Sequence, residues 1–231
     1  MDDRTWTDRA LARMFDDRRD AGRELASRLH AYGGRTDVVV LALPRGGVPV
    51  AFEIAEALGA PLDIFVVRKI GMPGHPEFAI GALASGGVRV LNDDVVRAYR
   101  IPSGAVDAVV RQELVELERR EREYRRGQSL IALRDRIVIL VDDGLATGST
   151  MRAAVAAVRL HTPARVIVAV PVGARSTCDE LAAIADEVVC AWTPEPFSAV
   201  GQWYHDFSQT TDEEVRALLE AHAQHTRNSI L

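Results

Sequence analysis

Short runs of apolar residues recur along the chain, and most are followed by a segment whose apolar residues repeat with a helical period. A continuous apolar run of this kind is typical of a strand that is buried on both faces of a parallel sheet. The runs occupy residues 37–43, 61–67, 87–91, 136–142, 165–172 and 187–192. Their alternation with helices predicts right-handed β-α-β units and a parallel sheet of the α/β class.

The helical segments differ in how much charge they carry. Residues 7–31 predict an amphipathic helix that ends at Gly33 and Gly34, and its candidate core residues are Leu11, Phe15, Leu25 and Leu29. Residues 103–126 predict a long helix in which glutamates precede arginines by four residues, the favourable order for surface ion pairs. Further helices are predicted at 48–58, at 177–185 and after a cap at Thr211 or Asp212. The Gly- and Pro-rich residues 71–78 predict a loop.

Composition narrows the class of protein. The chain has 231 residues, 48% hydrophobic and 26% charged, with a formal net charge of −5. These values are typical of a soluble globular protein, and the acidic balance does not favour a nucleic-acid surface. Cys178 and Cys190 lack a metal-site spacing and predict free thiols in a reducing compartment. A charged amino-terminal segment and the lack of a membrane-length apolar run predict a cytoplasmic protein that has no membrane partner.

The most specific pattern is VILVDDGLATGST at residues 138–150. An apolar strand delivers Asp142 and Asp143 to its carboxyl end, where open α/β sheets bind ligands. A turn rich in glycine and hydroxyl groups follows, and then a segment with good helix propensity, so that N–H groups at a helix start can face an anion. Carboxylates beside such a turn indicate a ligand with both hydroxyls and phosphate, such as a phosphorylated sugar.

Two other classes of protein place an apolar strand before aspartates. Receiver domains do so near their own amino terminus, whereas here strands and helices are predicted throughout the residues that precede 138. Labelling of an aspartate by acetyl phosphate would identify a receiver. A Walker B strand requires a phosphate loop of the form G-x-x-x-x-G-K-[ST], and the sequence has none.

Residues 138–150 resemble the phosphoribosyl-diphosphate (PRPP) motif of the type I phosphoribosyltransferases. The family pattern is four apolar residues, two acidic residues, Gly, two free positions, Thr-Gly, one free position and Thr, and every fixed position is met. The resemblance implies that Asp142 and Asp143 are catalytic residues that hold the ribose 2- and 3-hydroxyls. It also implies that the PRPP 5-phosphate is bound by Ala146, Thr147, Gly148, Ser149 and Thr150.

A second candidate region, residues 43–50, lies between the first apolar run and its helix. Arg45 offers a forked donor for phosphate and the glycines permit unusual backbone angles, although a plain tight turn would also need glycine. By resemblance, type I enzymes hold the leaving pyrophosphate at this point, in a loop that often contains a non-proline cis peptide. The corresponding residues are Pro44, Arg45, Gly46 and Gly47.

A third region, residues 66–78, resembles the segment that leads into the family's mobile catalytic loop. Arg68 and Lys69 match an Arg-Lys pair there, and the resemblance implies catalytic roles for both, with closure of residues 71–85 excluding water. Met72 stands where the family often has a further lysine, which weakens the assignment of a lysine clamp on pyrophosphate. Solvation at a strand end is the plain alternative for Arg68 and Lys69.

The last residues change in character. The resemblance implies one domain over residues 1–231, with a core at about 37–192 and a small hood at about 193–231. Aromatic side chains of the hood could stack on a base or pack together as its own core. The candidates for base binding are Phe197, Trp203 and Tyr204, and Phe207 belongs to the same cluster. His222 and His225 lack further ligand residues nearby, so a frayed terminal helix is the simpler interpretation.

The fold implied by the resemblance is a mainly five-stranded parallel sheet flanked by helices, with the hood at its carboxyl end. The implied activity is that of a glycosyltransferase of nucleotide metabolism, which moves ribose 5-phosphate from PRPP to a nitrogen acceptor and releases pyrophosphate. Mg²⁺ is the implied cofactor, held mainly through PRPP rather than by a protein metal site, and a homodimer is the implied assembly. A non-catalytic PRPP-binding regulator on the same fold is the alternative, and the sequence does not name the acceptor base.

Overall fold

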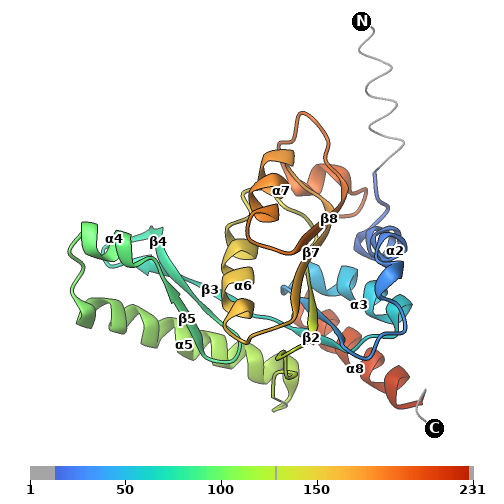
Figure 1. Cartoon of the computed structure of the whole chain (residues 1–231), viewed down its shortest axis with the longest axis horizontal. Helices are drawn as coiled ribbons and strands as arrows, with labels where there is room; N and C mark the ends of the chain where they lie inside the picture. The colour runs from blue at the N-terminus through green and yellow to red at the C-terminus, as the bar shows by residue number, and fades with distance from the viewer. Residues whose placement is uncertain (1–13, 128, 229–231) are drawn as a thin grey trace, which may run out of the picture.

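The computed structural model describes residues 14–127 and 129–228, which are organised around two sheets (Figure 1). The larger sheet has five parallel strands in the order β2-β1-β6-β7-β8. In that order the strands are Leu62–Ile64, Val38–Ala42, Ile137–Val141, Arg165–Val172 and Glu187–Trp192. This sheet and the helices on it form the body of the molecule, and its parallel arrangement confirms the predicted fold class.

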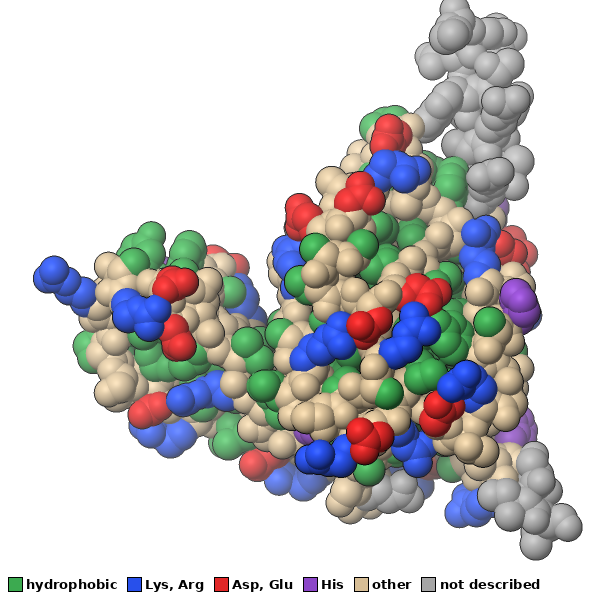
Figure 2. Space-filling model, viewed as in Figure 1, with side chains coloured by type: hydrophobic (Ala, Val, Ile, Leu, Met, Phe, Trp, Pro, Cys, Tyr) green, Lys and Arg blue, Asp and Glu red, His purple; other side chains and the backbone are tan. Residues whose placement is uncertain are grey.

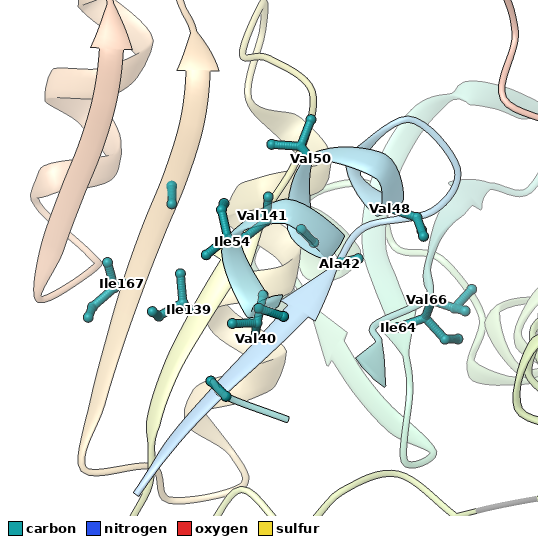
Figure 3. Close-up of a cluster of buried hydrophobic side chains, with 14 of the residues drawn as sticks. Val40, Ala42, Val48, Val50, Ile54, Ile64, Val66, Ile139, Val141 and Ile167 are labelled. Atoms are coloured by element: carbon teal, nitrogen blue, oxygen red, sulfur yellow. The ribbon is translucent and has the colours of Figure 1, made fainter. Parts of the chain in front are cut away.

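Helices cover both faces of the body sheet, which explains why β1 and β6 are apolar at every position and β7 at every position after Arg165. One face carries α2 (Arg18–Arg28), α3 (Gly47–Leu58) and α8 (Asp212–Asn228), and the other carries α6 (Ser149–Arg159) and α7 (Arg175–Ala182). Successive residues of a strand point to opposite faces. Val40 therefore packs with Ile54 of α3 (Figure 3), whereas Leu41 packs in the second core cluster with Met151 of α6.

The second sheet is antiparallel, in the order β3-β4-β5, and projects from the body with two helices (Figures 1 and 2). We call residues 67–125 the arm. Its elements are β3 (Val67–Met72), β4 (His75–Ala84), β5 (Val88–Leu91), α4 (Asp93–Ala98) and α5 (Ser103–Arg125). At the end of α5, Arg125 donates to Asp63 Oδ1 at 2.8 Å and to the carbonyl of Ile64 at 2.5 Å. These buried contacts anchor the arm to β2 of the body.

The arm corrects two expectations drawn from the sequence. The predicted strand 61–67 is split, because β2 ends at Ile64 and β3 begins at Val67 in the other sheet. The predicted loop 71–78 is a β-hairpin in which only the turn around Gly74 lies outside the strands. A Cβ at Gly71 would lie 2.6 Å from the Pro76 carbonyl oxygen, next to a register shift in the hairpin. Glycine here permits close approach of two strands at a bulge and does not mark a loop.

The helix predicted over residues 7–31 is described only in part, and the last helix begins at a predicted cap. In the described part of the range 7–31 the helix is α2, which begins at Arg18, where the side chain of Asp17 accepts from the Asp20 N–H at 2.8 Å. Residues 7–13, including Leu11, lie outside the described residues. After α2 ends at Arg28, a short 3-10 helix, η1 (His30–Tyr32), leads toward β1. In α8 the cap is Thr211, whose hydroxyl accepts from the Glu214 N–H at 3.1 Å.

The two histidines of α8 do not lie in a frayed end. The Nδ1 atoms of His222 and His225 lie 2.5 and 2.8 Å from the two carboxylate oxygens of Glu56 in α3. These contacts fasten α8 to α3, so they correct the interpretation of a frayed helix. None of the helices in the described part of the chain combines the length and apolar character that crossing a membrane requires.

Candidate functional site

Two regions that are far apart in the sequence meet at the carboxyl edge of the body sheet. Asp142 and Asp143 directly follow β6, and the loop after the neighbouring strand β1 lies against them. A Cβ at Gly46 would lie 2.0 Å from Asp143 Oδ2, and a Cβ at Gly47 would lie 2.7 Å from the carbonyl oxygen of Val141. Only glycine allows this close approach, so the loop and the acidic pair form a single site.

The loop between β1 and α3, together with the first residue of α3, contains the four residues that were expected to hold pyrophosphate. The Pro44–Arg45 peptide is cis, the feature that the resemblance implied for this loop. Arg45 Nη1 lies 3.7 Å from Oδ1 of Asp212, which also accepts from the Tyr124 hydroxyl at 2.5 Å. An ion pair of this length between half-exposed side chains is weak, so Arg45 remains able to bind an anion instead.

The turn between the acidic pair and α6 presents hydroxyl groups to solvent. Three hydroxyl side chains are exposed here: Thr147 in the turn, and Ser149 and Thr150 at the start of α6. Gly148 precedes α6 with a positive φ of 67°, and a Cβ there would lie 2.5 Å from Cγ2 of Thr177. Thr177 in turn donates to the carbonyl of Ala146 at 2.7 Å. Helix α7 therefore supports the turn, and the first N–H groups of α6, which have no partner within the helix, could bind an anion there.

The surroundings of the acidic pair destabilise the charged form of both carboxyl groups. Burial, and then the neighbouring charge of Asp143, raise the pKa of Asp142 well above its ordinary value. Burial also raises the pKa of Asp143, although the Arg18 guanidinium opposes that shift. The Asp143 N–H donates to Asp142 Oδ1 at 2.9 Å. A cation or a hydroxyl donor that entered this site would stabilise charge that the protein's own groups only partly compensate.

Sequence reasoning did not single out Arg18, which the structure brings to the acidic pair. Its Nε donates to Asp143 Oδ2 at 2.8 Å, and its Nη1 donates to the Ser208 carbonyl at 2.7 Å. Its guanidinium carbon lies 4.0 Å from the ring centroid of Phe207. Arg18 and Asp143 are separated by 125 positions. A contact at that separation leaves no periodicity or motif that could have revealed it from one sequence.

The aromatic residues of the expected hood lie next to the acidic pair. Trp203 and Tyr204 are 6% and 4% exposed and pack with Phe15, while Phe197 packs against the same cluster. The Tyr204 hydroxyl donates to the Asp143 carbonyl at 2.6 Å, and burial raises its pKa. The ring of Phe207 is 37% exposed and lies 5.0 Å from that of Tyr204. Trp203 and Tyr204 thus form a packed support for the site, and Phe207 offers a more accessible ring.

Most of the remaining hood is helix α8, whose first residue, Asp212, approaches the site through its ion pair with Arg45. Helix α8 packs against α3, and the Tyr124 hydroxyl of α5 reaches its first residue. The described residues 193–228 therefore divide into a segment beside the acidic pair and a helix that covers one face of the body.

The structure places Arg68 and Lys69 on β3 of the arm. Both Nε and Nη2 of Arg68 bond to Glu113 Oε2 of α5, at 2.8 and 2.7 Å. Lys69 Nζ lies 3.3 Å from the carbonyl oxygen of Glu77 and 3.7 Å from its Oε2. Among the described residues, the acidic pair is not a partner of either cation in these ion pairs.

The acidic pair is also the set of oxygen donors that best suits a hard cation. Within residues 14–127 and 129–228, no group of three or more His, Cys, Asp or Glu side chains is arranged to hold a metal ion. Two adjacent carboxylates would leave most coordination positions of Mg²⁺ to water and to ligand oxygens, as this ion prefers. Cys178 and Cys190 are free thiols, as expected.

Comparison with known proteins gives a consistent result. A family model described as a phosphoribosyl transferase domain matches residues 14–201. Two relatives from Mycobacterium tuberculosis, strains CDC 1551 / Oshkosh and H37Rv, carry phosphoribosyl transferase as a provisional name. Each is 54% identical over 208 residues, which are 90% of this chain and 47% of the relative. The chain thus spans about half the length of the curated relatives it matches.

One solved structure is similar over nearly its whole length. The crystal structure of TT1426 from Thermus thermophilus is 44% identical in sequence and superposes with a TM-score of 0.79. The match covers 89% of this chain and 97% of that chain. The two proteins therefore share their fold across most of the described residues.

Proposed function

This chain belongs to the phosphoribosyl transferase family, and we propose that it moves ribose 5-phosphate from PRPP to a nitrogen nucleophile with release of pyrophosphate. The acceptor is a nucleobase or a related heterocycle. One observation carries the proposal. The acidic pair after β6, the hydroxyl turn at the start of α6 and the glycine loop after β1 share one edge of the body sheet.

The three parts of the site divide the substrate between them. In this proposal Asp142 and Asp143 accept hydrogen bonds from the ribose 2- and 3-hydroxyls. Residues 146–150 bind the 5-phosphate through backbone N–H groups and the exposed hydroxyls. Residues 44–47 bind the pyrophosphate, with Arg45 supplying a forked donor to its oxygens.

The protein assists the reaction by positioning and by electrostatic complementarity. Breaking the bond between C1 and pyrophosphate places positive charge on the ribose ring and negative charge on the leaving group. The carboxylates of the acidic pair face the growing positive charge, and the loop after β1 faces the growing negative charge. No covalent nucleophile is required, because fixing the acceptor and C1 in line supplies much of the rate enhancement.

The residues present fit Mg²⁺ as a cofactor. The acidic pair offers hard oxygen donors, and extra positive charge there would be favourable because the pKa values of both carboxyls are raised. Mg²⁺ would be held by one or both of these carboxylates together with oxygens of PRPP. When bound, it would supply neutralising charge to the pyrophosphate.

The arm is proposed to close over the bound substrate and to exclude water. Arg68 and Lys69 lie on β3, the first strand of the arm sheet, so a rotation of the arm would move both cations. The pair of Lys69 with Glu77 joins exposed side chains and is exchanged at little cost, whereas Arg68 is held more firmly by Glu113. In the closed state Lys69 would meet charge that develops on the leaving pyrophosphate.

A pyrophosphate-release assay tests the proposal. The protein is incubated with PRPP and a panel of nucleobases and small heterocyclic amines, with and without Mg²⁺. We expect Mg²⁺-dependent release with at least one acceptor, and no release by the D142N/D143N double variant. Release that is equal in the wild type and the double variant would contradict the assignment.

A non-catalytic PRPP-binding regulator on the same fold is the second candidate. The engagement of Arg68 with Glu113, and Met72 in place of a lysine, favour an arm that lacks a catalytic cation. Such a protein would bind PRPP with Mg²⁺ and would release no pyrophosphate with any acceptor of the panel.

A further inference from the structure

We propose that Arg18 is a positioning residue of the PRPP site, which orients the Asp143 carboxylate for the ribose hydroxyls. This inference rests on the proposed function. It concerns a residue of α2, a helix that precedes the body sheet in the chain and contains none of the sequence motifs.

The contacts of Arg18 are those of a fixed side chain. It is 11% exposed, and its guanidinium is held on two edges and one face. One edge donates to Asp143 Oδ2, another donates to the carbonyl of Ser208, and the ring of Phe207 covers a face at 4.0 Å. A planar fork with donors on several edges suits this arrangement, and a lysine could satisfy only part of it.

The surroundings of Asp143 leave one oxygen for a ligand. Its N–H donates to Asp142, its carbonyl accepts from Tyr204, and its Oδ2 accepts from Arg18. Oδ1 is the oxygen that remains to accept from a ribose hydroxyl. Arg18 therefore determines where that oxygen points, because it fixes the rotation of the carboxylate.

Charge gives Arg18 a second effect at the same place. PRPP is a polyanion, and two adjacent carboxylates repel it unless a cation is close. A Cβ at Gly46 would lie 2.0 Å from Asp143 Oδ2 and 3.3 Å from Arg18 Nε, so the guanidinium compensates the charge of the carboxylate that lies against the proposed pyrophosphate loop. Its loss should therefore weaken PRPP binding more than the loss of an arginine elsewhere on α2.

Arg19 provides a matched control on the same helix. Its Nε bonds to Glu53 at 2.6 Å, and its guanidinium carbon lies 5.2 Å from the ring centroid of Phe52. Arg18 and Arg19 thus each have one carboxylate partner and one aromatic neighbour. Of the two, it is Arg18 that contacts the acidic pair. An effect on α2 packing alone would appear in both variants.

The experiment is calorimetric titration of the full chain with PRPP in the presence of Mg²⁺. We expect R18A to raise the Kd about tenfold or more, as for loss of a hydrogen bond to a charged group. We expect R19A to stay within about twofold of the wild type, and R18K to fall between the wild type and R18A. Thermal unfolding of each variant checks that the fold persists.

A double-mutant cycle with D143N separates positioning from a general structural role. If Arg18 acts through Asp143, adding R18A to D143N should change the Kd by no more than about twofold. An undiminished tenfold loss in the D143N background would overturn the inference, as would unchanged PRPP affinity in R18A. Tighter binding by R18A would also overturn it, because Arg18 would then compete with the ligand for Asp143. If the wild type itself binds no PRPP, the proposed function fails instead.

Discussion

The arm and the carboxyl edge of the body differ in how far their charged side chains are paired. In the arm, cations and carboxylates of neighbouring elements are partners, as in Arg68 with Glu113 and Arg89 with Asp107. At the edge of the body, Arg18 pairs with Asp143 and lies near Asp142, and both carboxyls retain raised pKa values. The arm therefore gains little from an added ligand, whereas the edge of the body gains from any group that supplies positive charge or hydroxyl donors.

Glycines in the arm and at the edge of the body also differ in what their missing side chain allows. The Cβ that Gly81 lacks would lie 2.3 Å from the Val90 carbonyl oxygen, so in the arm the missing side chain allows two strands to pair. The Cβ that Gly46 lacks would meet the Asp143 carboxylate, which is a movable side chain. A glycine of the arm thus serves the fold, while the glycine at the edge of the body serves the position of a carboxylate.

The largest effect is expected from Gly46→Ala. The new methyl group should displace the Asp143 carboxylate and weaken binding of PRPP with Mg²⁺ by about 3 kcal/mol, the upper range for lost hydrogen bonds to charged groups. The free energy of unfolding should fall by less than the binding free energy, because the Asp143 side chain and not the backbone must move, although its ion pair with Arg18 is disturbed. Calorimetry and urea unfolding measure the two quantities.

Gly104→Ala in α5 is the control for this substitution, because a Cβ there would meet no atom within 4 Å. It should leave PRPP affinity unchanged and raise stability by up to about 1 kcal/mol, as alanine favours a helix over glycine. If G46A binds PRPP normally, the close approach of the loop to the acidic pair has no functional role.

The next effect concerns the hydroxyl turn of the body. Thr147→Val removes an exposed hydroxyl and should weaken PRPP and ribose 5-phosphate alike, by about 1.5–3 kcal/mol. Free pyrophosphate should bind nearly as before, because it is assigned to residues 44–47. Titrations with the three ligands test this division, and an equal loss for all three would contradict it.

A smaller effect is expected on stability, from Asp142→Asn. The folded protein raises the pKa of Asp142 above 3.8, so folding favours the protonated carboxyl group. The unfolding free energy must therefore fall as pH rises from about 3.8 toward the folded pKa, and it levels off above that pKa. D142N should be more stable than the wild type at neutral pH, and the difference should shrink toward acid pH. Urea unfolding over a range of pH measures this, and a difference that does not vary with pH would show that burial of this charge costs little.

The smallest effect on stability is expected in the arm. Lys69→Ala breaks an exposed pair with Glu77 and should change the unfolding free energy by less than about 1 kcal/mol. If the arm closes as proposed, turnover should fall more than PRPP affinity. Arg89→Ala, which breaks another exposed pair of the arm, is the control and should alter neither turnover nor PRPP affinity. A fully active K69A variant would leave the arm without this catalytic contribution.

The same contrast explains what could be predicted from the sequence. Strands such as β6 and β7 are buried on both faces, so each appears as a continuous apolar run, and the residues of 138–150 follow one another in the chain. Strand β4 has no such signal, since its first residues are exposed and burial begins only near Ile80. The contact of Arg18 with Asp143 depends on packing between distant segments, which local patterns do not encode.

The most direct test of the central claim is calorimetric titration with PRPP and Mg²⁺ of the wild type and of the D142N/D143N double variant. The wild type should bind PRPP, and the double variant should remain folded while losing most of that affinity, because two carboxylates that accept from the ribose hydroxyls are gone. Equal affinity in the two proteins would contradict the placement of the PRPP site at the carboxyl edge of the body.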